Sequence, residues 1–378
     1  MRFLAFVLAA QIAPIQYSDV PPVFRPLVPL EAGFARYLAE IESATSARIR
    51  EGEFEHLIYY VLQSGAFTSE AIIEPALSAR IYIATGAIPE PVTRRVRSFL
   101  AVLGRPARDE RLQYFQKFLP PRDRNIRTLI AAYSQSMRFL HANETLEQKD
   151  VYESRGLSSD TRLASSFTIW NALGVLKATN PRLSLERVLI VGPGSDFAPR
   201  TGFDDSVPPR SYQPYAVADA LVSLGLAKEE SLSIDCADVN DRVLASVAAG
   251  RPRFRIEPGS DEFFQYQRHL AGRRNSVKIV PLKLNIVTQR LAAGQYGLII
   301  ATNVLLYLPK PHLALAAANI REMLVPGGYF IHNELRPETE TYTRALGFEW
   351  LQTRRILIAE GRKAPLYDTF SMLRRSAR

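Results

Sequence analysis

The second half of the sequence predicts an α/β fold, with a mostly parallel sheet, helices on both faces and a C-terminal antiparallel hairpin. An all-α domain is expected before it. From about residue 150 onward, short apolar runs typical of buried strands alternate with helical stretches, which is the pattern of a parallel sheet. Between residues 31 and 143, apolar residues instead recur at spacings of three and four, as on one helix face.

Residues 1–18 have two interpretations. A basic start and the apolar stretch FLAFVLAA are followed by small residues at Ala9 and Ala10, as in a secretory signal peptide. Leu8 stands where such a signal prefers a small residue, and an apolar N-terminal arm packed on the fold would give the same pattern. The first interpretation predicts export, and the second predicts a cytoplasmic protein.

Residues 19–30 are rich in proline and predict an extended tether, because successive prolines exclude a regular helix. Residues 31–150 predict a helical accessory domain without a chemical motif. A packing domain that forms homo-oligomers and a cap that selects the substrate both fit this pattern. The expected helices are residues 54–65, 69–83, 90–103, 109–118 and 125–141.

Residues 151–378 predict the α/β domain. A polar loop at residues 152–162 precedes a helix at 164–178, which leads to the first strand. The expected strands are residues 187–191, 232–235, 277–282, 297–302 and 328–333, and the expected hairpin pairs residues 351–359 with 367–373.

Composition argues against several classes of function. The net charge is +9, but the basic residues are scattered and form no stripe, so nucleic-acid binding is not favoured. No apolar run reaches the roughly 18 residues of a membrane-spanning helix. Cys236 is the only cysteine and is expected to be buried and inert, and the five histidines lack metal-ligand spacing. We therefore expect no metal site.

Four segments occur in an informative order. VLIVGPGSDF (188–197) is a strand running into a glycine turn, and SLSIDCAD (231–238) is a strand followed by acids. YGLIIATNVLLYL (296–308) leads into a Thr-Asn pair, and LVPGGYFIHNE (324–334) is a Pro-Gly-Gly turn feeding a strand. Together they resemble the class I, Rossmann-like S-adenosylmethionine (SAM)-dependent methyltransferases. The resemblance covers about residues 150–378, and the N-terminal half is not recognised.

In open parallel sheets, ligands bind beyond the carboxyl ends of the strands. The resemblance assigns Gly192, Pro193 and Gly194 to the methionine part of SAM, and glycines allow backbone N–H groups to approach a ligand closely. The sequence departs from the family at Ile190, where an acid is usual, and at Asp196, where a third glycine is usual. In the loop that follows, Asp204 or Asp205 either supplies the missing anion or faces solvent.

Three further polar residues are expected at strand ends. Asp235 is expected to end the second strand, where its carboxylate would accept hydrogen bonds from both ribose hydroxyls. The alternative is a helix N-cap, a role that Asp238 could also fill. The resemblance places Asn285 against the adenine, and it places Asn303 in contact with cofactor or acceptor.

Two residues are weak candidates for the acceptor side. Tyr307 either lines the acceptor pocket or packs in the core. His332, at the end of the fifth strand, either acts as a base, because imidazole titrates near neutrality, or is structural.

The resemblance implies methyl transfer from SAM to an acceptor that the sequence does not identify. This transfer is an in-line displacement that needs alignment of the acceptor and not necessarily a base. One alternative is a non-catalytic protein that retains the fold, suggested by the departures at Ile190 and Asp196. The other is an NAD(P)-dependent Rossmann oxidoreductase, although Phe197 replaces the last glycine of the motif GxGxxG.

Overall fold

The computed structural model describes residues 12–107, 109–145, 148–196, 210–254, 256–257, 259–360 and 365–377. The chain forms two compact units. Unit 1 contains the described residues of Met1–Ser43, Leu163–Pro193 and Tyr212–Arg378. Unit 2 contains those of Ala44–Arg162 and Gly194–Ser211.

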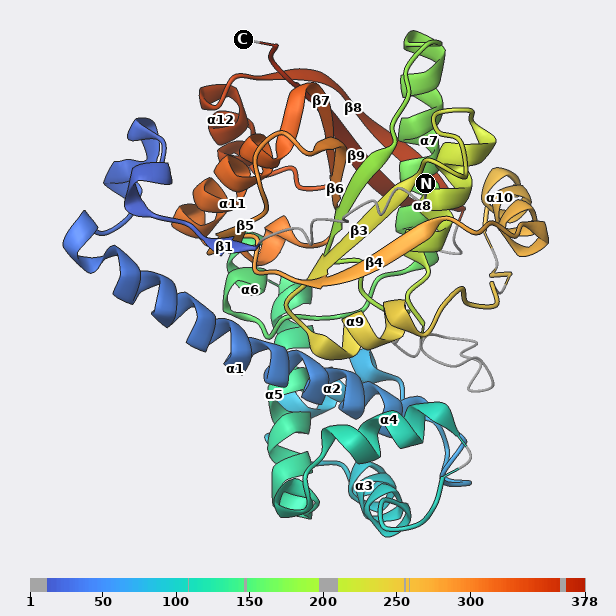
Figure 1. Ribbon diagram of the computed structural model, residues 1–378. Coiled ribbons are helices and arrows are strands. Elements are labelled where there is room, and N and C mark those ends of the chain that lie inside the picture. The colour runs from blue at the N-terminus through green and yellow to red at the C-terminus, as the bar shows by residue number, and fades with distance from the viewer. Residues whose placement is uncertain are drawn as a thin grey trace, which may run out of the picture. The chain divides into compact units, whose positions relative to one another are not determined.

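Unit 1 is built on a seven-stranded sheet with the strand order β4-β3-β2-β6-β7-β9-β8 (Figure 1). The first five strands in this order are parallel, and β9 runs antiparallel to both β7 and β8. The fold class expected from the sequence is thereby confirmed. The strands are β2 (Arg187–Val191), β3 (Ser233–Asp238), β4 (Lys278–Lys283), β6 (Tyr296–Ala301), β7 (Leu324–His332), β8 (Phe348–Ala359) and β9 (Leu366–Arg375).

The chain reverses its direction of travel across the sheet next to β2. From β2 it proceeds to β3 and β4 on one side, and it then returns to β6 and β7 on the other side. This switch point lies between β2 and β6, where open α/β sheets bind their ligands. The helices of this part are α7 (Leu163–Thr179), α8 (Gln213–Ser223), α9 (Asp241–Ala248), α10 (Asp261–Gly272), α11 (Lys310–Met323) and α12 (Pro337–Ala345).

Alternate side chains of the central strands enter two separate cores. Val188 and Ile190 pack with residues of α7 and α8 on one face of the sheet. Leu189 and Val191 pack on the other face with residues of α11 and of the N-terminal segment. Burial on both faces is typical of parallel sheets and explains why these strands read as continuous apolar runs.

The N-terminal segment of unit 1 differs from the extended tether that the sequence predicts. The strand β1 (Ala13–Pro14) pairs with β5 (Gln289–Arg290), and the proline-rich part forms the 3-10 helices η1 (Tyr17–Asp19) and η2 (Pro22–Leu27). Proline is tolerated in the first turn of a helix, and the burial of Phe24 holds η2 against the core. Residues 1–11, which carry the signal-like stretch, lie outside the described residues.

Unit 2 is helical. Its first helix is the second part of α1 (Glu31–Gln63), which continues without interruption to just before the expected end at Gly65. The buried guanidinium of Arg95 donates hydrogen bonds to the carbonyl groups of Val61 and Ser64 at the end of α1, which satisfies carbonyls that a helix end leaves open. The remaining α-helices are α2 (Pro75–Thr85), α3 (Glu90–Val102), α4 (Glu110–Phe118), α5 (Ile126–Thr145) and α6 (Gln148–Ser154).

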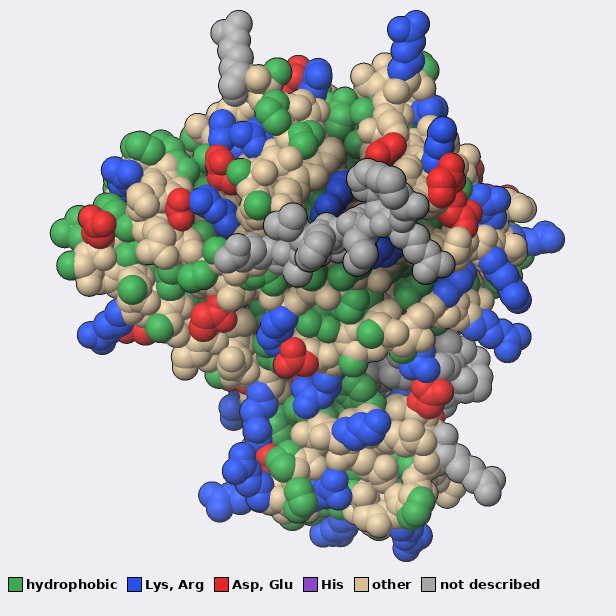
Figure 2. Space-filling model, viewed as in Figure 1, with side chains coloured by type: hydrophobic (Ala, Val, Ile, Leu, Met, Phe, Trp, Pro, Cys, Tyr) green, Lys and Arg blue, Asp and Glu red, His purple; other side chains and the backbone are tan. Residues whose placement is uncertain are grey.

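On the face drawn in Figure 2, the described Lys and Arg side chains are spread among acidic and uncharged groups, without one continuous basic patch. Within the described ranges, no helix combines the length and the apolar character that crossing a bilayer requires.

Candidate functional site

The glycine turn after β2 requires its glycines. Gly192 has φ +65°, and a Cβ atom on it would lie 2.3 Å from Cγ2 of Val304. Gly194 has φ +60°, and a Cβ atom on it would lie 2.1 Å from Oγ1 of Thr161. Gly194 and Thr161 both belong to unit 2. Both glycine positions therefore exclude a side chain. Pro193 is the last residue of this segment in unit 1.

Asp235 does not lie where the sequence predicts it. The strand β3 continues for three residues beyond it and ends at Asp238. Oδ2 of Asp235 accepts hydrogen bonds from the Tyr296 hydroxyl at 2.7 Å and from Nη2 of Arg187 at 3.1 Å. Because Arg187 and Tyr296 are the first residues of their strands, this cluster lies toward the amino end of the sheet. The expectation that Asp235 stands at the carboxyl end of its strand is therefore wrong.

The acid at that end is Asp238. It is 9% exposed, and its Oδ1 accepts a hydrogen bond from the backbone N–H of Asn240 at 2.7 Å. The N-cap of α9 is Asn240 itself, whose Oδ1 accepts from the N–H of Arg242. The N–H of Gly192 donates to the carbonyl of Ala237 at 2.8 Å, which places Asp238 beside the glycine turn.

Asn285 follows the end of β4 and supports a local turn. Its Oδ1 accepts a hydrogen bond from the N–H of Val287 at 3.1 Å, and its own N–H donates to Oε1 of Gln289 at 3.0 Å. The side chain is buried. Contact with adenine remains a prediction for this residue.

Asn303, directly after Thr302 beyond the end of β6, has φ +58° and is the one non-glycine residue with positive φ in the described part of the chain. Its backbone N–H donates to Oδ1 of Asn333 at 2.8 Å, and its Oδ1 accepts from Nδ2 of Asn333 at 2.7 Å. Its Nδ2 donates to Oγ of Ser165 on α7 at 3.2 Å. Asn303 thus joins the ends of β6 and β7 to α7.

Asp368 extends this network, and sequence reasoning missed it. Its Oδ2 accepts a hydrogen bond from Oγ1 of Thr168 at 3.0 Å, and its Oδ1 accepts from the N–H of Thr369 at 2.8 Å. The side chains of Ser165 and Asn333 are further hydrogen-bond partners. Burial raises the pKa of Asp368, and these hydrogen bonds oppose that effect. No local pattern marks the residue, because the side chains that bond to it lie far away in the sequence.

His332 is fully buried next to the rings of Phe330 and Trp350. Its Nδ1 accepts a hydrogen bond from the N–H of Glu334 at 3.2 Å. Burial lowers the pKa of His332 to about 3. The imidazole is therefore neutral and a weak base near pH 7. Tyr307, in the 3-10 helix η4 (Leu305–Tyr307), is 7% exposed, and its place in an acceptor pocket remains a prediction.

The thiol of Cys236 is buried in the sheet, and burial, together with the charges of Asp235 and Asp238, raises its pKa. Such a thiol has little nucleophilic character. Across the described residues, no three His, Cys, Asp or Glu side chains converge as metal ligands. Phe197, Asp204 and Asp205 fall within residues 197–209, which lie outside the described residues.

The solved structures that this chain resembles include SAM-dependent methyltransferases. The N-methyltransferase NodS from Bradyrhizobium japonicum WM9, in complex with S-adenosyl-L-homocysteine, is 15% identical, with a TM-score of 0.33, over 55% of this chain and 85% of its own. Magnesium protoporphyrin IX methyltransferase (ChlM) from Synechocystis PCC 6803, with bound SAM, is 14% identical, with a TM-score of 0.33, over 62% of this chain and 100% of its own. No protein-family model and no curated protein matches the sequence. At these identities and scores, the likeness says nothing about the reaction of this chain.

Proposed function

We propose that the protein binds SAM at the carboxyl edge of the sheet in unit 1 and transfers its methyl group to an acceptor. The observation that carries this proposal is the hydrogen bond from Gly192 to Ala237 at 2.8 Å. It holds the glycine turn after β2 beside the end of β3, whose last residue is Asp238, next to the switch point in strand order.

The residues at this edge suit a nucleoside that carries an amino-acid tail. A carboxylate offers two acceptor oxygens, so Asp238 is suited to the vicinal hydroxyls of a ribose. The N–H of Gly192 already donates to Ala237 and Pro193 has none, so the turn offers a ligand its backbone carbonyl groups as acceptors. We therefore assign ribose binding to Asp238 in place of Asp235, and binding of the methionine part to the turn Gly192–Pro193. A role for Gly194 remains a prediction.

SAM supplies an electrophilic methyl group, and the chain's task is to align the acceptor with it. We place the acceptor near the polar network of Asn303, Asn333 and Asp368, which lies beyond the ends of β6 and β7. The hydrogen bonds within this network fix the side chains before an acceptor arrives. Such a fixed arrangement favours positioning of the acceptor, and we assign no base to the reaction.

A non-catalytic protein with the same fold is the second candidate. Ile190, which stands where the family usually has an acid, is fully buried among apolar neighbours of α7 and α8. A cofactor contact that is usual in the family therefore has no counterpart at this position. This observation favours a non-catalytic binding or scaffold protein that retains the fold.

Calorimetric titration of the full chain with SAM, S-adenosylhomocysteine, NAD and NADP separates the candidates. The proposal predicts saturable binding of the first two ligands and none of the last two. Binding of NAD alone would indicate an oxidoreductase. If SAM binds, incubation of the protein and a cell extract with methyl-labelled SAM should give a labelled product that a heat-inactivated sample does not give. Binding without any labelled product would favour the non-catalytic candidate.

A further inference from the structure

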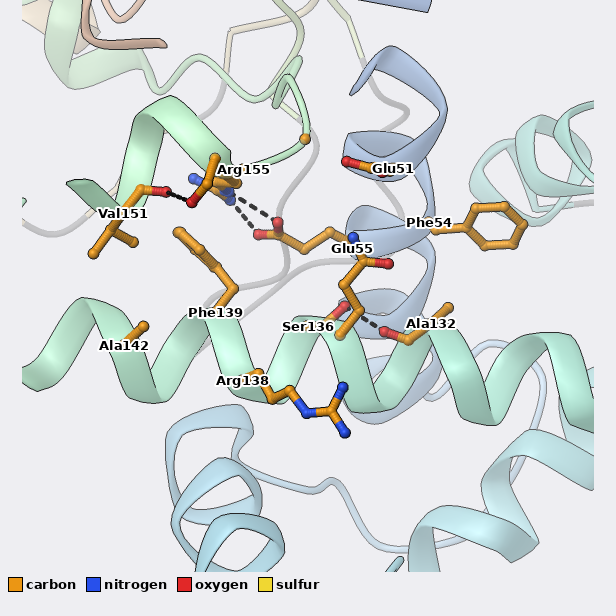
Figure 3. A pocket seen from close by; sticks show the side chains of 13 residues that line it. Glu51, Phe54, Glu55, Ala132, Ser136, Arg138, Phe139, Ala142, Val151 and Arg155 are labelled. Atoms are coloured by element: carbon orange, nitrogen blue, oxygen red, sulfur yellow. Dashed lines mark hydrogen bonds and ion pairs between the residues drawn. The ribbon is translucent and has the colours of Figure 1, made fainter. Parts of the chain in front are cut away.

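Unit 2 contains a cavity of about 260 Å³ that is formed entirely by its own residues (Figure 3). Its walls come from α1, α5, α6 and the turn that follows α6. An apolar cavity of about 150 Å³ accommodates benzene, and drug-sized ligands occupy pockets of about 300 Å³ or more. The volume in unit 2 therefore fits one aromatic ring with a small substituent.

Most of the wall is apolar. Ala132, Phe139 and Ala142 contribute from α5, and Val151 contributes from α6. Gly156 completes the wall where the chain leaves α6. A Cβ atom on it would lie 2.5 Å from the backbone nitrogen of Gly52 in α1. Close packing of these two backbones thus fixes the shape of the cavity on this side.

A buried ion pair forms part of the polar wall of the cavity, to which Glu51, Gln135, Ser136, Arg138 and Ser154 also contribute. Nε of Arg155 donates to Oε2 of Glu55 at 2.9 Å, and Nη2 of Arg155 contacts Oε1 of Glu55. Only 12% of the Arg155 side chain and 6% of the Glu55 side chain are exposed. In Figure 3 the two side chains point toward one another between α6 and α1. The central carbon of the guanidinium lies 3.9 Å from the ring centroid of Phe139.

Stability alone does not explain such a pair, because removing two charges from water costs as much as their attraction returns. A few fixed polar groups in an apolar pocket are instead the usual composition of a ligand site. The four charged residues that line the cavity are Glu51, Glu55, Arg138 and Arg155, so its formal charge is zero. A charged ligand would compete with the pair, whereas a hydroxyl or amide group can bond to it without breaking it.

We propose that this cavity binds an uncharged aromatic molecule with one ring and one hydrogen-bonding substituent. The ring packs among Phe139, Ala142 and Val151, and the substituent bonds to the Arg155–Glu55 pair. This site is separate from the SAM site proposed for unit 1, and it does not depend on that proposal.

The test uses the full-length protein and three single-ring probes that differ in charge: phenol, benzoate and benzylamine. Saturation-transfer NMR and calorimetry should detect saturable binding of phenol, with the two charged probes at least tenfold weaker. Ala142→Phe fills the cavity and should abolish phenol binding. Ala131→Phe is the matched control, because Ala131 lies on the same helix, is exposed and does not line the cavity, and it should bind phenol normally. Circular dichroism establishes that both variants are folded.

A second variant tests the role of the ion pair without changing the volume. Glu55→Gln removes the carboxylate that neutralises Arg155. We therefore expect this variant to bind benzoate at least tenfold more tightly than phenol, the reverse of the wild-type preference. This result also keeps the proposal testable if Ala142→Phe fails to fold. Three outcomes would overturn the proposal: no phenol binding by the wild type, undiminished phenol binding by folded Ala142→Phe, or an unchanged preference in Glu55→Gln.

Discussion

The hydroxyl of Tyr296 donates a 2.7 Å hydrogen bond to the carboxylate of Asp235, across the intervening strand β2. Tyr296 is fully buried and Asp235 is 6% exposed. Burial, followed by this hydrogen bond, raises the pKa of Tyr296, so the hydroxyl keeps its proton and acts as the donor. The bond joins β3 to β6 and gives a buried acid a structural role near the amino end of the sheet.

The Asp235→Ala variant should lower the free energy of unfolding by about 1–3 kcal/mol, because it leaves the buried Tyr296 hydroxyl without its acceptor. Arg187 contributes little, since about half of its side chain is exposed. Urea unfolding measures the loss. In a double-mutant cycle with Tyr296→Phe, the double variant should lose less than the sum of the two single variants. Additive losses would show that the two side chains do not interact.

The positive φ of Asn303 predicts an order of stability among its variants. Both Asn303→Gly and Asn303→Ala lose the side-chain hydrogen bonds to Asn333 and Ser165 and keep the backbone N–H donor. Only alanine, however, has a Cβ atom that makes the left-handed conformation costly. The alanine variant should therefore be less stable than the glycine variant by about 1–2 kcal/mol in urea unfolding. Equal stability of the two variants would mean that Asn303 does not hold this conformation in solution.

His332 should make stability depend on pH. Its folded-state pKa of about 3 lies below the ordinary value of 6.5, so the unfolded chain binds the proton more tightly. The contribution of neutral His332 to the free energy of unfolding is therefore complete above pH 6.5 and is lost as the pH falls toward 3. Relative to His332→Phe, the free energy of unfolding of the wild type should fall by up to about 1.4 kcal/mol for each pH unit in this window. Urea unfolding of both proteins from pH 7 to pH 4 tests this, and a constant difference would contradict it.

Asp368 should act in the opposite direction. Burial raises its folded-state pKa above the ordinary value of 3.8, so the folded state binds the proton more tightly. The cost of the charge is absent below pH 3.8 and grows as pH rises through the raised folded-state pKa. Asp368→Asn removes this cost and should gain stability relative to the wild type between pH 4 and pH 7. A relative loss over the same interval would disprove the direction of the shift.

The sequence predicts an element well where the signal is local. The strand β2 was expected at residues 187–191 and forms Arg187–Val191, because a strand that is buried on both faces is a continuous apolar run in the sequence. Partners that are distant in sequence leave no such mark. We expected Asp235 to end its strand because nothing nearby in the sequence accounts for a buried carboxylate. The hydroxyl that bonds to this carboxylate belongs to Tyr296, 61 residues away. Asp368 was missed because Thr168 lies 200 residues away.

In the proline-rich segment, a distant contact likewise overrides the structure that the local composition predicts. Its composition predicts an extended chain, since proline lacks the N–H that a helix needs. In the fold, η2 buries the ring of Phe24, 5.2 Å from the ring of Tyr342 on α12. This tertiary contact, more than 300 residues away along the chain, selects short 3-10 turns over the extended form.

The central claim is that Asp238, and not Asp235, holds the ribose of SAM at the carboxyl edge of the sheet. Calorimetric titration with SAM of the wild type, Asp238→Ala and Asp241→Ala tests it most directly. Asp241 is the matched control, because its side chain is 82% exposed at the start of α9. We expect Asp238→Ala to lose about 1.5–3 kcal/mol of binding free energy, or about ten- to more than a hundredfold in affinity, and Asp241→Ala to bind like the wild type. Unchanged affinity in a folded Asp238→Ala, or no SAM binding by the wild type, would contradict the claim.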